Sequence, residues 1–112
     1  MKFKTETEDG VVIVRVPSDA LDAGNVMEFK NNIAPILESA DKVVLNMGRV
    51  KFMDSSGVGA MLSCLRTMHA KNGELKLFGV RHQLVQLFKL VRLDRIIEVY
   101  DSKKAAVEAF KA

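Results

Sequence analysis

The sequence predicts an α/β fold in which a mixed, mostly parallel sheet of about five strands is covered by about four helices. Segments with apolar residues at helical spacing alternate with short apolar segments that are typical of strands. This strand–helix–strand alternation requires right-handed crossovers and therefore a largely parallel sheet. The expected order is β-β-α-β-α-β-α-β-α. No linker, repeat or low-complexity stretch divides residues 1–112, so we expect one domain.

The first two strands are predicted to form a hairpin. Residues 3–7 alternate between apolar and polar side chains, and Asp9-Gly10 is a turn signal. The segment 11–16 is almost continuously apolar, which is typical of a strand buried on both faces. The first strand should therefore lie antiparallel, at or near an edge of the sheet.

The remaining elements follow from apolar spacing and capping residues. One helix is expected over 23–39, bent near Asn31 because Pro35 interrupts it. A second helix is expected over 56–71, and it ends at Asn72-Gly73. Further strands are expected over 42–47, 74–80 and 96–100, a third helix over 81–91, and a last helix after Asp101-Ser102. The residues expected to face the core from the four helices are Val26, Phe29, Ile33, Ile36 and Leu37; Val58, Met61, Leu62, Leu65 and Met68; Leu84, Leu87, Phe88 and Val91; and Ala106, Val107 and Phe110.

The chain is organised around the segment from Val50 to Gly59, which contains Asp54-Ser55-Ser56-Gly57 before an apolar-periodic helix. Acids and serines cap helix N-termini because their oxygens accept the unpaired backbone N–H groups there. Either serine could be the cap, and local chemistry alone favours a plain helix cap. A helix N-terminus also attracts negative charge and binds phosphate, so a phosphorylated serine could be accommodated.

The topology predicts which loop residues are neighbours. Loops at the carboxyl ends of parallel strands gather on one edge of a sheet. The loops 18–25 and 48–56 both follow such strands. We therefore expect Asp19, Asp22, Asp54 and Ser55 to lie close together.

Catalytic motifs are missing from the sequence. Met53 and Asp54 precede the two serines, whereas the nucleophile elbow of a hydrolase requires a glycine two residues before its serine. The chain has neither a P-loop nor a complete dinucleotide fingerprint. Its only cysteine, Cys64, and its two histidines, His69 and His82, are scattered and make a poor set of metal ligands. We expect no enzymatic activity, no metal and no cofactor, with Cys64 buried and both histidines near the surface.

Composition limits the partners and the compartment. The net charge is +3, and the cations are interleaved with acids rather than gathered with aromatic residues, so we expect no direct contact with nucleic acid. Apolar runs are far shorter than a membrane span, and residues 1–6 lack the core of a signal peptide. A monomer in the cytoplasm, away from the membrane, is expected.

The segment Val50-Lys51-Phe52-Met53-Asp54-Ser55-Ser56-Gly57-Val58-Gly59, placed after the third strand, closely resembles the STAS domain. Within that family it is most similar to the bacterial anti-sigma factor antagonists of partner-switching systems. The resemblance covers nearly the whole chain, including the Leu87-Phe88 helix and the Arg95-Ile96-Ile97 strand. It implies a regulatory phosphoprotein in transcription and signal transduction.

The resemblance also assigns roles to residues. Ser55 corresponds to the phosphoacceptor of the family, whose unphosphorylated form binds and sequesters a serine kinase that doubles as an anti-sigma factor. Phosphorylation abolishes that binding and a separate metal-dependent phosphatase reverses it, while the kinase supplies ATP and Mg²⁺. Asp22 resembles the acid of the family's Gly-Glu-Leu-Asp turn. The partner-binding residues implied are Asp22, Asp54, Ser55, Ser56, Gly57 and Val58.

Two departures from the family pattern and two alternative functions accompany this interpretation. The turn lacks its glycine and has the sequence Ser18-Asp19-Ala20-Leu21-Asp22, and Arg92 stands where the family commonly has glycine. The alternatives are a STAS subunit of a membrane lipid-transport or transporter complex, and a STAS module that senses a small molecule or nucleotide.

Overall fold

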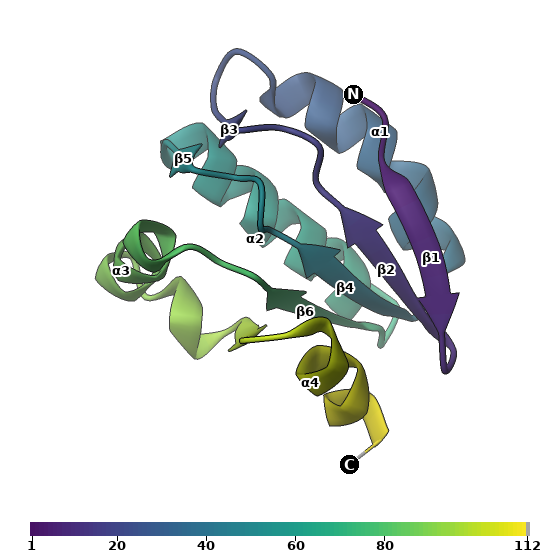
Figure 1. Cartoon of the computed structure of the whole chain (residues 1–112). Helices are drawn as coiled ribbons and strands as arrows, with labels where there is room; N and C mark the ends of the chain where they lie inside the picture. Colours follow the sequence, from purple (N-terminus) through teal and green to yellow (C-terminus); the bar gives the residue numbers. More distant parts are fainter. Residues whose placement is uncertain (112) are drawn as a thin grey trace.

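The computed structural model describes residues 1–111 and confirms the mixed α/β fold. Its main sheet has five strands in the order β1-β2-β4-β6-β7 (Figure 1). The strands are β1 (Lys4–Glu8), β2 (Val11–Arg15), β4 (Lys42–Asn46), β6 (Glu74–Phe78) and β7 (Glu98–Tyr100). The helices are α1 (Val26–Ser39), α2 (Ser55–Ala70), α3 (His82–Leu90) and α4 (Lys103–Glu108), with 3-10 turns at Leu93–Arg95 and Ala109–Lys111.

The strand directions agree with the predicted topology. β1 lies antiparallel to β2 at one edge of the sheet, and Asp9 and Gly10, which form the turn between them, both have positive φ. β2, β4, β6 and β7 are parallel to one another. Their carboxyl ends therefore share one edge, toward which β3, β5 and α3 lie in Figure 1.

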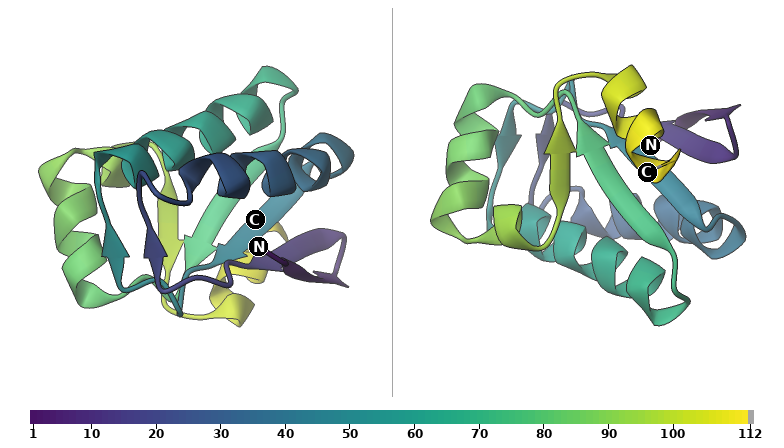
Figure 2. Two further views of the ribbon diagram at one scale, coloured as in Figure 1. Left: turned by 90° about the horizontal axis from the view of Figure 1, so that it is seen from above. Right: turned by 90° about the horizontal axis from the view of Figure 1, so that it is seen from below.

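Helices cover the two faces of the sheet unequally. α1 and α2 lie on one face, whereas α4 is the only one of the described α-helices that covers the other (Figure 2). The larger core lies under α1 and α2, where Phe29, Ile33, Met61 and Met68 are almost completely buried. A smaller core joins α4 to the opposite face through residues Val11, Ile13, Val44, Ala106 and Val107. The unequal cover leaves part of the α4 face open.

A second sheet, which the sequence pattern did not predict, consists of two short parallel strands, β3 (Ala20–Leu21) and β5 (Phe52–Met53). Strands of two residues are too short to show a period, so apolar patterning cannot reveal them. This sheet joins the two loops that the topology was expected to bring together.

The prediction that the first helix begins at residue 23 is wrong, because α1 begins at Val26. The backbone N–H groups of Asn25 and Val26 both donate to the Asp22 carbonyl oxygen, so the preceding residues form a turn. α1 then continues without a break through Pro35, whose ring is exposed to solvent. The bend expected near Asn31 stays a prediction.

The region after α3 also differs from the prediction. Val91 is 46% exposed instead of facing the core, because α3 ends at Leu90 and the chain turns through Arg92. Leu93 is buried in the 3-10 turn, and the last strand begins at Glu98 instead of Ile96. Arg92 has a φ of 63°, in the left-handed region that favours glycine.

Candidate functional site

The site is built where the two loops meet at the start of α2. The Asp19 carbonyl oxygen accepts the backbone N–H groups of Lys51 at 2.7 Å and Phe52 at 3.2 Å. One step along, β3 pairs with β5 through Leu21 and Met53. The segment 19–25 is thereby fixed beside the segment that leads into α2.

Asp54 is the N-cap of α2, so the prediction that one of the two serines caps the helix is wrong. Its Oδ1 accepts the Gly57 N–H at 3.0 Å, and its Oδ2 accepts the Ala23 N–H at 3.1 Å. These hydrogen bonds, the one from Gly57 first, hold the pKa of the Asp54 carboxyl below its usual value of 3.8. The carboxylate is therefore ionised at neutral pH and has already taken one of the helix N–H groups.

Ser55 is the first residue of α2 and is exposed to solvent. Since Asp54 makes the cap, the Ser55 hydroxyl is not needed to hold the helix. Ser56 and Val58, in the same first turn of α2, are half-buried. The two serines, which local chemistry could not separate, thus differ in their access to solvent.

Gly57 is buried at the contact between α2 and β3. A Cβ atom at this position would lie 2.2 Å from the Leu21 carbonyl oxygen and 2.4 Å from Met53 Cγ. No side chain can occupy that space without moving the backbone of β3. Gly57 therefore serves packing, and the direct partner contact expected of it stays a prediction.

Asp22 shapes the loop before α1. Its carboxylate accepts the Gly24 N–H at 2.9 Å, and its own N–H donates to Asn25 Oδ1 at 3.0 Å. The Asn25 amide also donates to Ser18 Oγ and to the Ala20 carbonyl oxygen. These side-chain bonds close the turn that lacks the family's glycine, and Asp22 remains half-buried beside Ala23.

Asp19 lies further along the same edge in an exposed ion pair. Arg49 Nε donates to Asp19 Oδ1 at 3.0 Å, and this bond holds the pKa of the Asp19 carboxyl below its usual value. Asp19 and Asp54 therefore have different partners along this edge: Asp19 pairs with Arg49, whereas Asp54 accepts the Ala23 N–H.

The candidate metal ligands and the cysteine that the sequence offers lie apart from one another. No group of three His, Cys, Asp or Glu side chains in residues 1–111 could hold a metal ion. His69 and His82 are both exposed, as expected. Cys64 is buried as predicted, and burial raises its pKa to about 12, so its thiol is unreactive at neutral pH. In the same described range, no helix has the length and apolar content to cross a membrane.

The STAS domain family model matches residues 2–106. The chain belongs to the STAS domain family. Two curated relatives are an anti-sigma-B factor antagonist of Staphylococcus aureus, 26% identical over 88% of this chain and 92% of its own, and an anti-sigma F factor antagonist of Paenibacillus polymyxa, 28% identical over 96% of this chain and 92% of its own. The crystal structure of a candidate anti-sigma factor antagonist from Thermotoga maritima has a TM-score of 0.89 and 26% identity, and the match covers 98% of this chain and 95% of that one.

Structures of the Bacillus cell fate determinant SpoIIAA also share the fold. The unphosphorylated form has a TM-score of 0.72 and the phosphorylated form 0.70, each at 23% identity, over 97% or more of this chain and 99% of theirs. The two forms match this chain almost equally well.

Two exposed apolar side chains of this STAS domain lie in the segments that carry the site. Phe52 in β5 is 55% exposed, and Met27 in the first turn of α1 is 64% exposed. Sequence reasoning did not select either residue, because apolar patterning assigns such side chains to the core. Only the short β3–β5 sheet, which leaves Phe52 outward, could have indicated its position.

Proposed function

We propose that this STAS domain is an anti-sigma factor antagonist in which Ser55 is a phosphorylation switch. The observation that carries the proposal is that Ser55 is exposed at the first position of α2 while Asp54 caps the helix. A kinase can thus reach the Ser55 hydroxyl without breaking the cap. The names of the Staphylococcus and Paenibacillus relatives support this function over a transporter subunit.

The unphosphorylated protein binds a serine kinase that doubles as an anti-sigma factor and thereby releases its target. The contact surface comprises Asp22, Asp54, Ser55, Ser56 and Val58, with Phe52 and Met27 as apolar anchors. The kinase supplies ATP and Mg²⁺, and a separate metal-dependent phosphatase restores Ser55. The protein itself acts in the cytoplasm as a monomer without enzymatic activity.

The geometry explains how a phosphate would prevent binding. Phosphorylation adds a charge of about −1.5 to −2 next to the ionised Asp54 carboxylate. Because Asp54 already accepts the Gly57 N–H, the phosphate faces outward instead of replacing the cap. A partner surface shaped around a neutral hydroxyl must then bury or repel a dianion, a penalty of ~3–5 kcal/mol that weakens binding by roughly 10²–10³-fold or more.

The test is a titration of three variants against the serine kinase that copurifies with the wild-type protein. Ser55→Ala should bind the kinase and stay bound when ATP is added, whereas Ser55→Asp should bind at least about 10²-fold more weakly. Ser56→Ala is the matched comparison: it removes a neighbouring hydroxyl of the contact surface without adding charge, so it should weaken binding far less than Ser55→Asp. ATP should release Ser56→Ala from the kinase as it releases the wild type. Equal affinities of Ser55→Ala and Ser55→Asp would contradict the proposal.

A second measurement assigns the modified serine. Labelled phosphate should enter the wild type and Ser56→Ala but not Ser55→Ala, and fragmentation mass spectrometry should locate it on Ser55. Phosphate on Ser56 of the unmutated protein would overturn the assignment. Copurification of a membrane ATPase instead of a soluble kinase would favour the transporter alternative.

A further inference from the structure

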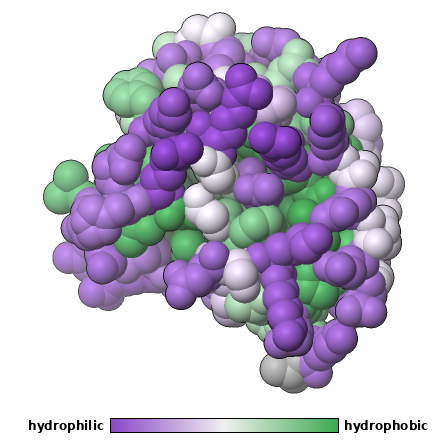
Figure 3. All heavy atoms as spheres, in the orientation of Figure 1, coloured by the Kyte–Doolittle hydropathy of each residue, from purple (hydrophilic) through white to green (hydrophobic). Residues whose placement is uncertain are grey.

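Four side chains form a row across the open part of the sheet, on the face that α4 covers only partly. The strand registers place Lys4 opposite Arg15, Arg15 opposite Asn46, and Asn46 opposite Phe78. Because residues paired in this way point to the same face, the row runs continuously from β1 to β6. The space-filling view, in the orientation of Figure 1, shows apolar residues recessed between hydrophilic side chains on this face (Figure 3).

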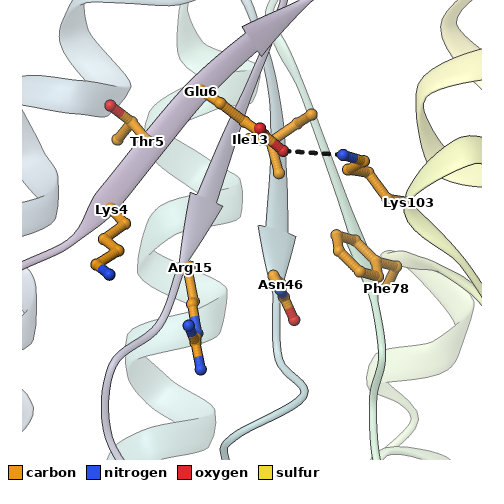
Figure 4. Close-up of a pocket in the computed structure, with 8 residues that line it drawn as sticks. All are labelled: Lys4, Thr5, Glu6, Ile13, Arg15, Asn46, Phe78 and Lys103. Carbon is orange, nitrogen blue, oxygen red and sulfur yellow. Dashed lines mark hydrogen bonds and ion pairs between the residues drawn. The ribbon is translucent and has the colours of Figure 1, made fainter.

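A hollow of about 510 Å³ lies over this row, and we call it the open-face groove (Figure 4). Ile13, which is 4% exposed, and the half-buried Phe78 give it an apolar floor. Lys103 of α4 closes one side and donates to Glu6 Oε1 at 3.1 Å. The volume is within the range of sites for small organic molecules.

The groove continues into a second hollow of about 410 Å³ at the carboxyl edge of the sheet, which we call the edge pocket. Arg15 and Asn46 line both. The edge pocket adds three cations, Arg49, Lys51 and Arg81, and one acid, Asp19. The two hollows therefore form one path that turns from the face of the sheet over its edge at Arg15.

Positive charge is concentrated along this path. Its lining includes six cationic residues and two acids, an excess of four positive charges, whereas the whole chain has a net charge of +3. The remainder of the molecule is thus close to neutral. Such an excess in a hollow with low-dielectric walls attracts anions.

Arg15 is the cation at the junction that lacks compensation. Among the ion pairs of the described residues, Arg49 pairs with Asp19 and Lys103 with Glu6, but neither Arg15 nor Lys4 is paired. Like charges directly opposite each other on neighbouring strands are destabilising. A bound anion would relieve the repulsion between Lys4 and Arg15.

The Asn46 side chain is oriented so that it can donate a hydrogen bond to an anion in the groove. Its Oδ1 accepts the Gly48 N–H at 2.9 Å, which leaves the amide NH₂ group as the donor on the other side. A donor next to Arg15, above an apolar floor, suits a ligand that carries an anionic group on a flat apolar body.

We propose that the open-face groove binds a small organic anion of this class, such as an aromatic phosphate or carboxylate. The apolar body lies on Ile13 and Phe78, and the anionic group lies between Lys4, Arg15 and the Asn46 amide. A second anionic group on the same molecule would extend toward the edge pocket. This site is distinct from Ser55 and does not depend on the proposed kinase.

The test is an amide NMR titration of the full chain with three probes in a buffer of low ionic strength without phosphate. Phenyl phosphate combines the anion with an aromatic ring, inorganic phosphate is the anion alone, and benzyl alcohol is the neutral aromatic. Phenyl phosphate should bind saturably with a Kd of about 1 mM or tighter. Shifts should be confined to residues 4–6, 13–15, 46–48 and 78–79, and the other two probes should bind more weakly.

Arg15→Gln should weaken phenyl phosphate binding by at least about tenfold. Arg66→Gln is the matched control, because Arg66 is an exposed arginine on α2, on the opposite side of the sheet. Both variants should keep the wild-type spectrum outside the mutated site, and Arg15→Gln should still accept phosphate from the kinase at Ser55.

Three results would overturn the site: no saturable binding of phenyl phosphate, equal weakening by both variants, or shifts centred on α2. Equal binding of phenyl phosphate and inorganic phosphate would show that the apolar floor has no part in recognition and would overturn the assigned ligand class. None of these outcomes bears on phosphorylation of Ser55.

Discussion

Asp54 is hydrogen-bonded to Ala23, a residue that lies 31 positions earlier in the chain. The two oxygens of its carboxylate have separate partners, the Gly57 N–H within α2 and the Ala23 N–H in the loop before α1. One side chain therefore both starts the helix that presents Ser55 and holds the loop that carries Asp22. Changes at Asp54 should affect the whole site.

Asp54→Ala should lower the melting temperature more than Asp54→Asn. An asparagine oxygen can still cap α2, whereas the asparagine NH₂ group cannot accept the Ala23 N–H, so Asp54→Asn loses only the tie to the loop. Amide hydrogen exchange of residues 22–25 should accelerate in both variants. Unchanged exchange there in Asp54→Asn would show that the bond to Ala23 does not hold the loop.

The stability difference between the wild type and Asp54→Asn should depend on pH, because the pKa of Asp54 is lowered in the folded state. Because the carboxyl has a lower pKa in the folded state than its usual 3.8, its ionised form stabilises the fold. That contribution is present above pH 3.8 and is lost as the pH falls through the folded-state pKa. The stability difference between the wild type and Asp54→Asn should therefore be constant near neutral pH and shrink below about pH 4 in urea unfolding at each pH.

Gly57→Ala and Gly59→Ala should change stability in opposite directions. The added methyl at Gly57 would meet Leu21 and Met53 at less than 2.5 Å, so we expect a loss of about 2–3 kcal/mol or failure to fold. A methyl at Gly59 would have no heavy atom within 4 Å among the described residues, apart from its two chain neighbours and the nearby backbone of α2, and alanine is the better helix former. Gly59→Ala should gain about 0.5–1 kcal/mol in urea unfolding.

The sign of each effect tests the packing of α2 on β3. A stable, soluble Gly57→Ala with an unchanged spectrum would show that α2 can move away from β3 at little cost. A loss of stability in Gly59→Ala would show that the exposed side of this turn is also constrained.

Ser56→Ala should cost less than about 0.5 kcal/mol, because Ser56 does not cap α2. Ser102→Ala is the matched comparison, since Ser102 Oγ accepts the Ala105 N–H at 3.1 Å and caps α4. Loss of that cap should cost about 1 kcal/mol. Urea unfolding of both variants measures the difference in unfolding free energy. A cost at Ser56 equal to that at Ser102 would show that Ser56 also caps α2.

The main elements were predictable because apolar spacing reports burial directly. The spacing of Phe29, Ile33 and Leu37, for example, marks the buried face of α1, and all three are at most 2% exposed. The sequence pattern places the start of α1 three residues too early, because Asp22 and Asn25 have the composition of a helix start but use their side chains in a turn. Periodicity cannot distinguish these two uses.

The site was only partly predictable, because its details depend on contacts between residues that are distant in the sequence. Asp54, Ser55 and Ser56 are all good capping residues, and which of them caps depends on Ala23, whose N–H attracts the second carboxylate oxygen of Asp54.

The burial of Lys76 also could not be predicted from the local sequence pattern. Lys76 is 5% exposed because Glu74 and Glu98 reach it from neighbouring positions, an arrangement that depends on the pairing of β6 with β7.

Arg92→Gly should stabilise the protein by about 0.5–1 kcal/mol. Arg92 follows α3 with a φ of 63°, and its N–H donates to the Lys89 carbonyl oxygen, which is a common way for a helix to end. In the left-handed region a Cβ atom crowds the backbone, at a cost of roughly 1–2 kcal/mol, and glycine removes that strain. Part of the gain is lost because glycine raises the conformational entropy of the unfolded chain, by about 0.4–1 kcal/mol.

Asn72→Gly is the matched control for Arg92→Gly. Asn72 has nearly the same φ, 62°, but asparagine tolerates this conformation better than arginine does. Its replacement should therefore change stability by less than half as much. The midpoints of urea unfolding measure both effects, provided that the slope of the unfolding free energy against urea concentration is unchanged. A loss of stability in Arg92→Gly, or an equal gain in Asn72→Gly, would show that the arginine is not strained. The expected result would show that the left-handed turn after α3 forms with an arginine at a small cost in stability.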